Sequence, residues 1–191
     1  MGWSCSWIAV RGQEADALLN TLGLRRTGEL QEIPESRWSA ATLPDGWFLV
    51  FCAKHCEPKA FKEAALAVLA AGCELVHSSV EEHVMFSSSA YWQEGRKVWE
   101  IVHDAQEGVD HLQAAGELPP YFAAIRTRYF SELEAAGGDQ NEVDYIFEVP
   151  LEVGAALTRF RHDLDYPTDD PEPFEILRST PGAKKPWWKI W

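Results

Sequence analysis

Cysteine is scarce in this chain, whose 191 residues include only four cysteines. So few thiols in a chain of this length exclude a disulfide scaffold of the kind that holds small secreted domains together. The chain also lacks an apolar run long enough to span a bilayer, and no charged leader precedes its first apolar stretch, which ends at Arg11. Gly2 and Ser6 fit the myristoylation pattern, with Cys5 beside them, but a strand beginning near residue 4 accounts for them more simply. We therefore expect a cytoplasmic protein without a membrane anchor.

Basic residues are few as well. The chain has 17 Lys and Arg against 30 Asp and Glu, which gives a formal net charge of −13 and an isoelectric point near 4.8. A field of this sign repels phosphate backbones and anionic lipid headgroups, and it attracts cationic proteins. We therefore expect no binding to nucleic acid or membranes, and we expect that any protein partner is basic.

The motifs of common catalytic and nucleotide-binding sites are also missing. The sequence contains no Walker loop, no dinucleotide-binding glycine motif and no Gly-x-Ser-x-Gly nucleophile elbow. Its glycines stand where turns are expected between secondary-structure elements. We therefore expect no cofactor, and the sequence favours a non-enzymatic function over an enzymatic one.

The composition that remains is that of an ordinary globular protein, with 46% hydrophobic and 25% charged residues. Nine tryptophans are many for this length, and they indicate that aromatic packing dominates the core or an interface. We expect one α+β domain over residues 1–191, built from a mostly antiparallel sheet with helices packed on it.

The first eighty residues alternate between strand and helix patterns. Strands are expected at 6–10, 38–43, 47–53 and 74–79, and helices at 13–24 and 58–72. The second and third strands form a hairpin, because a Pro-Asp-Gly turn separates them. The resulting order, β-α-β-β-α-β, is ferredoxin-like. That arrangement serves many unrelated functions, so it indicates no activity.

The second half of the chain contains a further hairpin and then becomes more helical. We expect hairpin strands at 83–92 and 97–104, a turn at 110–115, a helix at 119–137, a strand at 143–149, a helix at 150–161 and an acidic loop at 163–175.

The hairpin at 83–104 could hold a nucleophile–base pair, Ser88 and His103. A two-residue turn pairs Ser88 with Ile101, which puts Ser88 and His103 on one face of the sheet at a distance that side chains can bridge. A buried histidine that a local serine satisfies explains the pair more simply. We expect no catalytic residues, with Ser88 and His103 as weak candidates.

The best metal candidates are three cysteines and a histidine, Cys52, Cys56, Cys73 and His77. Three thiolates and an imidazole would make a closed tetrahedral zinc site. The spacing of three residues between Cys52 and Cys56 is one longer than in zinc knuckles, and Cys52 lies in an apolar strand where a buried thiol is common. We therefore expect no bound metal and keep these four residues as weak candidates.

The acidic loop at 163–175 is followed by a basic and aromatic tail at 184–191, in which three lysines alternate with tryptophans. We expect the tail to dock on its own domain or on a second copy of the chain. The binding residues expected in these two segments are Asp163, Asp165, Asp169, Asp170, Trp187, Trp188 and Trp191.

These observations support three hypotheses about function. The first is an acidic intracellular binding or inhibitory protein, such as an immunity protein that masks a basic toxin or enzyme; opposite charge speeds such encounters. The second is a small hydrolase or metalloenzyme that uses His103 with Ser88 or with the Cys and His residues. The third is a structural protein that forms homo-oligomers through its aromatic tail. The first hypothesis is favoured by the net charge and by the lack of a catalytic motif.

Overall fold

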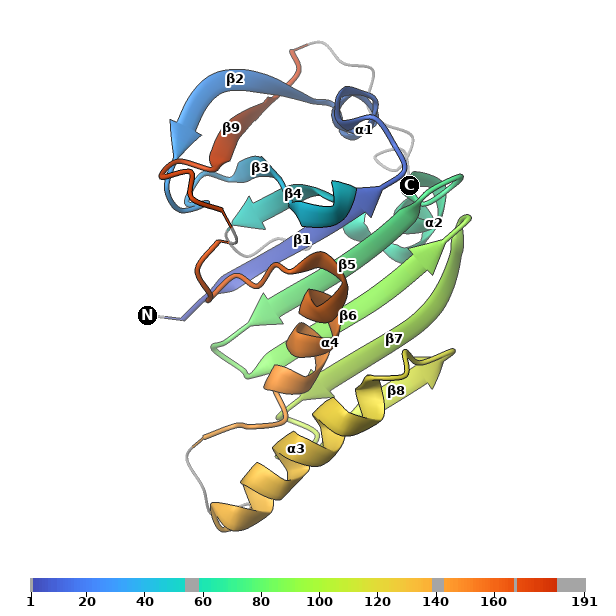
Figure 1. The fold of residues 1–191 in the computed structure, drawn as a ribbon, viewed down its shortest axis with the longest axis vertical. Coiled ribbons are helices and arrows are strands. Elements are labelled where there is room, and N and C mark those ends of the chain that lie inside the picture. Colours follow the sequence, from blue (N-terminus) through green and yellow to red (C-terminus); the bar gives the residue numbers. More distant parts are fainter. Residues whose placement is uncertain (1, 54–58, 139–142, 167, 182–191) are drawn as a thin grey trace.

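The computed structural model describes residues 2–53, 59–138, 143–166 and 168–181. Nine strands form one antiparallel sheet in the order β2-β9-β3-β4-β1-β5-β6-β7-β8 (Figure 1), which confirms the predicted α+β class. The strands are β1 (Ser4–Arg11), β2 (Leu24–Gln31), β3 (Trp38–Thr42), β4 (Phe48–Ala53), β5 (Glu74–Glu81), β6 (Phe86–Gln93), β7 (Arg96–Asp104), β8 (Gln113–Gly116) and β9 (Phe174–Ser179). The helices are α1 (Ala15–Leu22), α2 (Glu63–Leu69), α3 (Phe122–Ala135) and α4 (Glu148–Thr158), with 3-10 turns η1 (Pro44–Gly46) and η2 (Lys59–Phe61).

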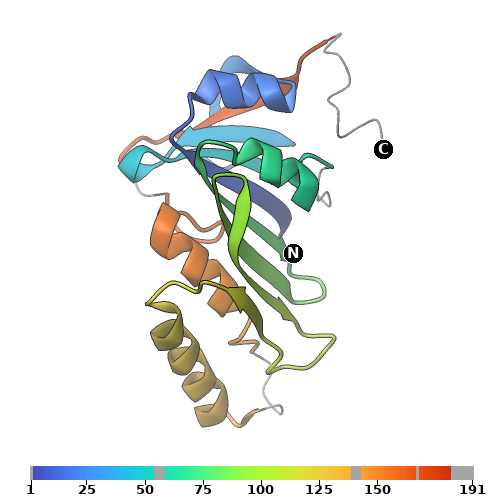
Figure 2. The same cartoon turned by 90° about the vertical axis from the view of Figure 1, so that its right-hand side faces the viewer.

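Helices cover both faces of the sheet (Figure 2). Leucines of α1 and α2 pack with Ile8 and Val10 on one face. On the other face Trp7 packs with Leu151 of α4, and α3 joins α4 over the β6–β7 end. Successive residues of a strand point to opposite faces, so β1 is buried along nearly its whole length. Its apolar run follows from this burial on both sides.

The first half of the chain follows the predicted pattern except for one strand. The helix α1, the β3–β4 hairpin, the helix α2 and the strand β5 form where the sequence predicts them. The strand β2 is not predicted, because its burial shows no alternation and most of its side chains are exposed. It pairs with β9 at the edge of the sheet. With β2 inserted, the elements run β-α-β-β-β-α-β, so the ferredoxin-like order is not confirmed.

The β6–β7 hairpin forms as predicted, but its pairing is shifted. Trp92 pairs with Lys97, whereas Tyr91 pairs with Trp99, so the register shifts by one residue between these two pairs. Such a β-bulge reverses the faces on which all later side chains of one strand lie. The predicted pairing of Ser88 with Ile101 is therefore wrong: the partner of Ser88 is Val102.

Two predictions for the last third of the chain are wrong. The second half of the predicted turn at 110–115 belongs to the short edge strand β8, and the strand at 143–149 is a turn that leads into α4. Ile146, Val149 and Val153 are fully buried at the spacing of one helix face, which outweighs the local alternation. The acidic segment is also shorter than expected, because β9 begins at Phe174.

Within the described residues, no helix combines the length and the hydropathy that a membrane crossing requires.

Candidate functional site

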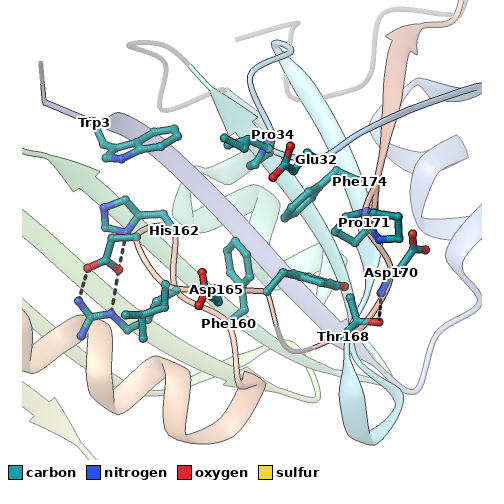
Figure 3. Close-up of a pocket in the computed structure, with 16 residues that line it drawn as sticks. Trp3, Glu32, Pro34, Phe160, His162, Asp165, Thr168, Asp170, Pro171 and Phe174 are labelled. Carbon is teal, nitrogen blue, oxygen red and sulfur yellow. Dashed lines mark hydrogen bonds and ion pairs between the residues drawn. The ribbon is translucent and has the colours of Figure 1, made fainter.

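A cavity of about 540 Å³ opens on the α4 face of the sheet. Three parts of the chain form it: the start of β1, the turn after β2, and the segment that runs from α4 to β9 (Figure 3). Its volume lies within the range of small-molecule and side-chain pockets. The lining residues are Trp3, Glu32, Ile33, Pro34, Phe160, Arg161, His162, Asp163, Leu164, Asp165, Tyr166, Thr168, Asp170, Pro171, Pro173 and Phe174.

The end of α4 directs the chain into this cavity. Arg159 follows the helix with a left-handed φ of 58°, and its N–H closes the helix by donating to the Ala155 carbonyl at 2.7 Å. Phe160 then turns back onto the sheet, where its ring meets Trp7 edge-on at a centroid distance of 5.5 Å. Because Phe160 is anchored in the core, the acidic residues that follow it are held at the surface above the sheet.

Aromatic rings form much of the cavity wall. Tyr166 and Phe174 lie 4.9 Å apart between ring centroids. The Tyr166 hydroxyl donates a hydrogen bond to the Thr42 carbonyl at 2.5 Å, which fixes the ring in place. Burial raises the pKa of Tyr166 to about 12, so this hydroxyl stays protonated. Trp3 closes the opposite side, with its ring perpendicular to that of His162 (Figure 3).

His162 presents a buried acceptor in this cavity. Its side chain is 1% exposed, and Nε2 lies 3.3 Å from Glu82 Oε1. A carboxylate can only accept, so Nε2 carries the hydrogen. Burial lowers the pKa of His162, which leaves Nδ1 with a lone pair. This Nδ1 has no hydrogen-bond partner among the described residues; the nearest charged atom, Asp163 Oδ1, lies 3.7 Å away.

The cavity carries net negative charge. Among the described lining residues the single cation is Arg161, which is held by Asp163 at 2.7 Å and by Glu148 at 2.6 Å. In the described part of the chain, the other lining carboxylates have no ion pair; these are Glu32, Asp165 and Asp170. Unpaired carboxylates, a bare imidazole nitrogen and aromatic faces all attract a cation that donates hydrogen bonds. The arrangement therefore suits an ammonium or guanidinium group.

Three of the binding residues that the sequence predicts line this cavity, namely Asp163, Asp165 and Asp170. Asp169 is exposed but does not line it. The predicted tail residues lie outside the described residues; these are Trp187, Trp188 and Trp191. Sequence reasoning missed the rest of the cavity. The one available signal was His162 between Arg161 and Asp163, directly after a helical pattern.

The structure separates the two weak catalytic candidates. His103 shares the α4 face with Ser87, its pairing partner, and Ser88 points to the opposite face, where it lines a different cavity. The Ser87 hydroxyl donates to the Phe147 carbonyl at 2.7 Å. His103 is fully buried, and both its ring nitrogens are engaged, by the His111 carbonyl at 2.7 Å and by Asp144 Oδ2 at 2.8 Å. The expectation that Ser88 and His103 share a face is therefore wrong.

The weak metal candidates are spread along β1. Cys52 pairs with the β1 strand at Ser6, whereas Cys73 lies beside Gly12, beyond the other end of that strand. Six residues of extended chain separate these two places by roughly 20 Å. His77 lies between them, opposite Ile8, and Cys56 lies outside the described residues. In the part of the chain that is described, no group of three or more His, Cys, Asp or Glu residues could hold a metal ion.

Comparison with known proteins found no matching family model, no matching curated protein and no matching solved structure.

Proposed function

We propose that this protein binds a basic partner protein and inhibits it by masking, as an immunity protein does, and that the cavity around His162 receives a lysine or arginine side chain of that partner. The observation that carries this proposal is the chemistry of the cavity. In the described part of the chain its carboxylates Glu32, Asp165 and Asp170 have no ion pair and Nδ1 of His162 has no hydrogen-bond partner. Its lining includes the aromatic rings of Trp3, Phe160, Tyr166 and Phe174.

A cationic side chain would gain from both features. Contact between a cation and an aromatic face contributes about 0.5–1 kcal/mol at exposed sites and about 2 kcal/mol when water is excluded. Hydrogen bonds to ionised groups contribute roughly 1.5–3 kcal/mol each. An anionic ligand would instead face like charge on Glu32, Asp165 and Asp170. The net charge of −13 adds long-range steering of a basic partner toward the surface.

No such support exists for the hydrolase hypothesis. A general base needs a free ring nitrogen within reach of a substrate, and both nitrogens of His103 are engaged in the core. The hypothesis of oligomers built through the aromatic tail concerns residues 184–191, outside the described part, and stays a prediction.

The test compares two variants with the same net charge. In Asp165→Asn/Asp170→Asn two carboxylates of the cavity are neutralised, and in Asp169→Asn/Glu134→Gln two exposed carboxylates outside it are neutralised. Proteins captured from cell extract by the wild-type chain are identified by mass spectrometry, purified, and titrated with all three proteins at several salt concentrations.

We expect a partner with more Lys and Arg than Asp and Glu, whose association slows as salt rises. It should bind the control variant like the wild type and bind the cavity variant at least about tenfold more weakly, the equivalent of one charged hydrogen bond. An acidic partner, equal binding to both variants, or capture of nothing by the wild type beyond what the cavity variant captures would contradict the proposal.

A further inference from the structure

A second cavity, of about 190 Å³, lies on the opposite face of the sheet between α2 and the strands β5, β6 and β7. Figure 2 shows α2 standing over this region. It shares no lining residue with the His162 cavity, so the two sites are independent of each other. Its lining residues are Phe61, Glu63, Leu66, His77, Phe86, Ser88, Ala90, Trp92, Lys97, Glu100 and Val102.

Two buried ring nitrogens in this lining have no hydrogen-bond partner within the described residues. They are Nε2 of His77 and Nε1 of Trp92, and the two residues are 7% and 3% exposed. Buried polar atoms are nearly always paired, because an unpaired one has lost its water without gaining a replacement. Both residues line the same cavity, so a molecule bound there is one source of the missing partners.

The protonation states of these two side chains limit which ligand groups can pair with them. Burial, assisted by the nearby Lys97 charge, lowers the pKa of His77 to about 4, so at neutral pH its ring has one N–H and one lone pair. The indole of Trp92 can only donate. A hydroxyl or carbonyl oxygen can accept from the indole, and a hydroxyl can in addition donate to the imidazole.

The rim disfavours a charged ligand. The Lys97 ammonium is bound by Glu63 at 3.1 Å and by Glu100 at 3.0 Å, so it offers no free positive charge to an anion. Six of the eleven lining residues are apolar or aromatic, with Phe61 and Leu66 on one side and Phe86 and Val102 among the strand residues. Such walls favour an apolar body. The volume corresponds to about six water molecules at roughly 30 Å³ each, and a small substituted benzene ring fits within it.

We propose that this cavity binds a small uncharged molecule with an apolar body and a hydroxyl or carbonyl oxygen, which pairs with His77 Nε2 and Trp92 Nε1. Two buried nitrogens without a hydrogen-bond partner among the described residues, beside the apolar and aromatic side chains of the cavity, support this ligand class.

The test uses four benzene derivatives that differ in their single substituent: phenol, toluene, benzoate and benzylamine. Each is titrated at pH 7 into ¹⁵N-labelled protein while the indole N–H resonance of Trp92, assigned with Trp92→Phe, is followed by NMR. We expect a saturable shift with phenol. Toluene, benzoate and benzylamine should bind at least about tenfold more weakly, as expected for one missing hydrogen bond or one unpaired charge.

The variant His77→Phe keeps the ring and removes the nitrogen. It should lower the affinity for phenol by about tenfold and leave that for toluene unchanged, whereas the control Ser179→Ala, at the exposed end of β9 outside the cavity, should leave the phenol affinity unchanged. Equal binding of toluene and phenol, tighter binding of benzoate or benzylamine, or no saturable shift, as for a cavity that holds water only, would overturn the proposal. If His77→Phe does not fold, the proposal is decided by whether the wild type binds phenol more tightly than the other three compounds.

Discussion

The buried histidines of this protein differ in charge because their ring nitrogens face different groups. His103 Nδ1 faces the His111 carbonyl, which can only accept, and Nε2 faces the Asp144 carboxylate. Burial opposes a charge on this ring, but the hydrogen bonds to Asp144 and to the carbonyl outweigh it and raise the pKa of His103. Burial prevails at His77 and His162, where it lowers the pKa. Because each ring nitrogen of His103 faces an acceptor, this ring is placed to hold a second proton, with the Asp144 carboxylate as its partner.

Removal of the Asp144 carboxylate should destabilise the fold. Asp144→Ala leaves His103 buried without its carboxylate partner, and breaking a buried pair in this way costs about 3–5 kcal/mol. Asp144→Asn should cost less, because the amide can still accept from the Phe147 N–H, which lies 3.1 Å from Oδ1, and can donate to a neutral imidazole. Urea unfolding of the three proteins measures the difference. Equal stabilities of the wild type and Asp144→Ala would contradict the role of Asp144 as the stabilising partner of His103.

The raised pKa of His103 also predicts the direction in which the free energy of unfolding changes with pH. A raised folded-state pKa means that the contribution of His103 is fully present below its unfolded pKa of about 6.5 and is lost as pH rises through the folded pKa. The lowered pKa values of His77 and His162 act in the opposite direction, with their contribution lost as pH falls below about 6.5. Above pH 6.5 the free energy of unfolding should therefore decline more in the wild type than in Asp144→Ala. Parallel curves would contradict this account.

At the scale of elements, the position of α4 depends on a glycine. A Cβ at Gly154 would lie 2.5 Å from Ser89 Oγ and 3.2 Å from Ser78 Oγ, and these two hydroxyls are hydrogen-bonded to each other at 3.1 Å. A serine hydroxyl cannot move far, so the helix itself would have to shift. The missing side chain therefore lets α4 lie close to β5 and β6.

The variant Gly154→Ala tests this packing. In an exposed helix interior alanine stabilises by about 1 kcal/mol relative to glycine, but overpacking here should produce a net loss of about 1–3 kcal/mol. Ser89→Ala removes the hydroxyl, so the double variant should recover at least about 1 kcal/mol of that loss in a double-mutant cycle. A stabilising Gly154→Ala, or strictly additive effects, would contradict the close approach.

Elements with a clear local pattern could be predicted from the sequence. The strands β1 and β4 are short apolar runs, the helices α1 and α2 show helical apolar periodicity, and turn signals bound these elements. The strands β2 and β9 could not, because most side chains of β2 are exposed and its pairing partner is distant in the chain. The bulge in the β6–β7 hairpin was also not visible, and it moves Ser88 away from the face of His103.

The candidate site was predicted only in part for a related reason. Asp163, Asp165 and Asp170 follow one another in an acidic segment, so composition alone drew attention to them. Trp3 and Glu32 join them only after the chain folds, because the cavity combines segments that are far apart in the sequence. Local patterns contain no information about such a convergence.

At the scale of the whole molecule, the proposed function combines the overall negative charge with the His162 cavity. The net charge of −13 attracts cationic partners from any direction, while the His162 cavity concentrates unpaired carboxylates between aromatic walls at one point of the surface. In the proposed function, the overall field sets the association rate and the cavity sets the orientation of a basic partner. The central claim is therefore that this cavity itself, apart from the general field, selects a cationic side chain.

The most direct measurement titrates the protein with N-acetyl-arginine amide and with its uncharged counterpart N-acetyl-norleucine amide, while NMR follows the Trp3 indole and the His162 ring. We predict saturable shifts with the arginine compound only, weaker at high salt because the screening length falls from about 10 Å at 0.1 M to about 3 Å at 1 M. The shifts should vanish in Asp165→Asn/Asp170→Asn and persist in Asp169→Asn/Glu134→Gln. Equal responses to both compounds, or loss of binding in the control variant, would contradict a cation-selective cavity.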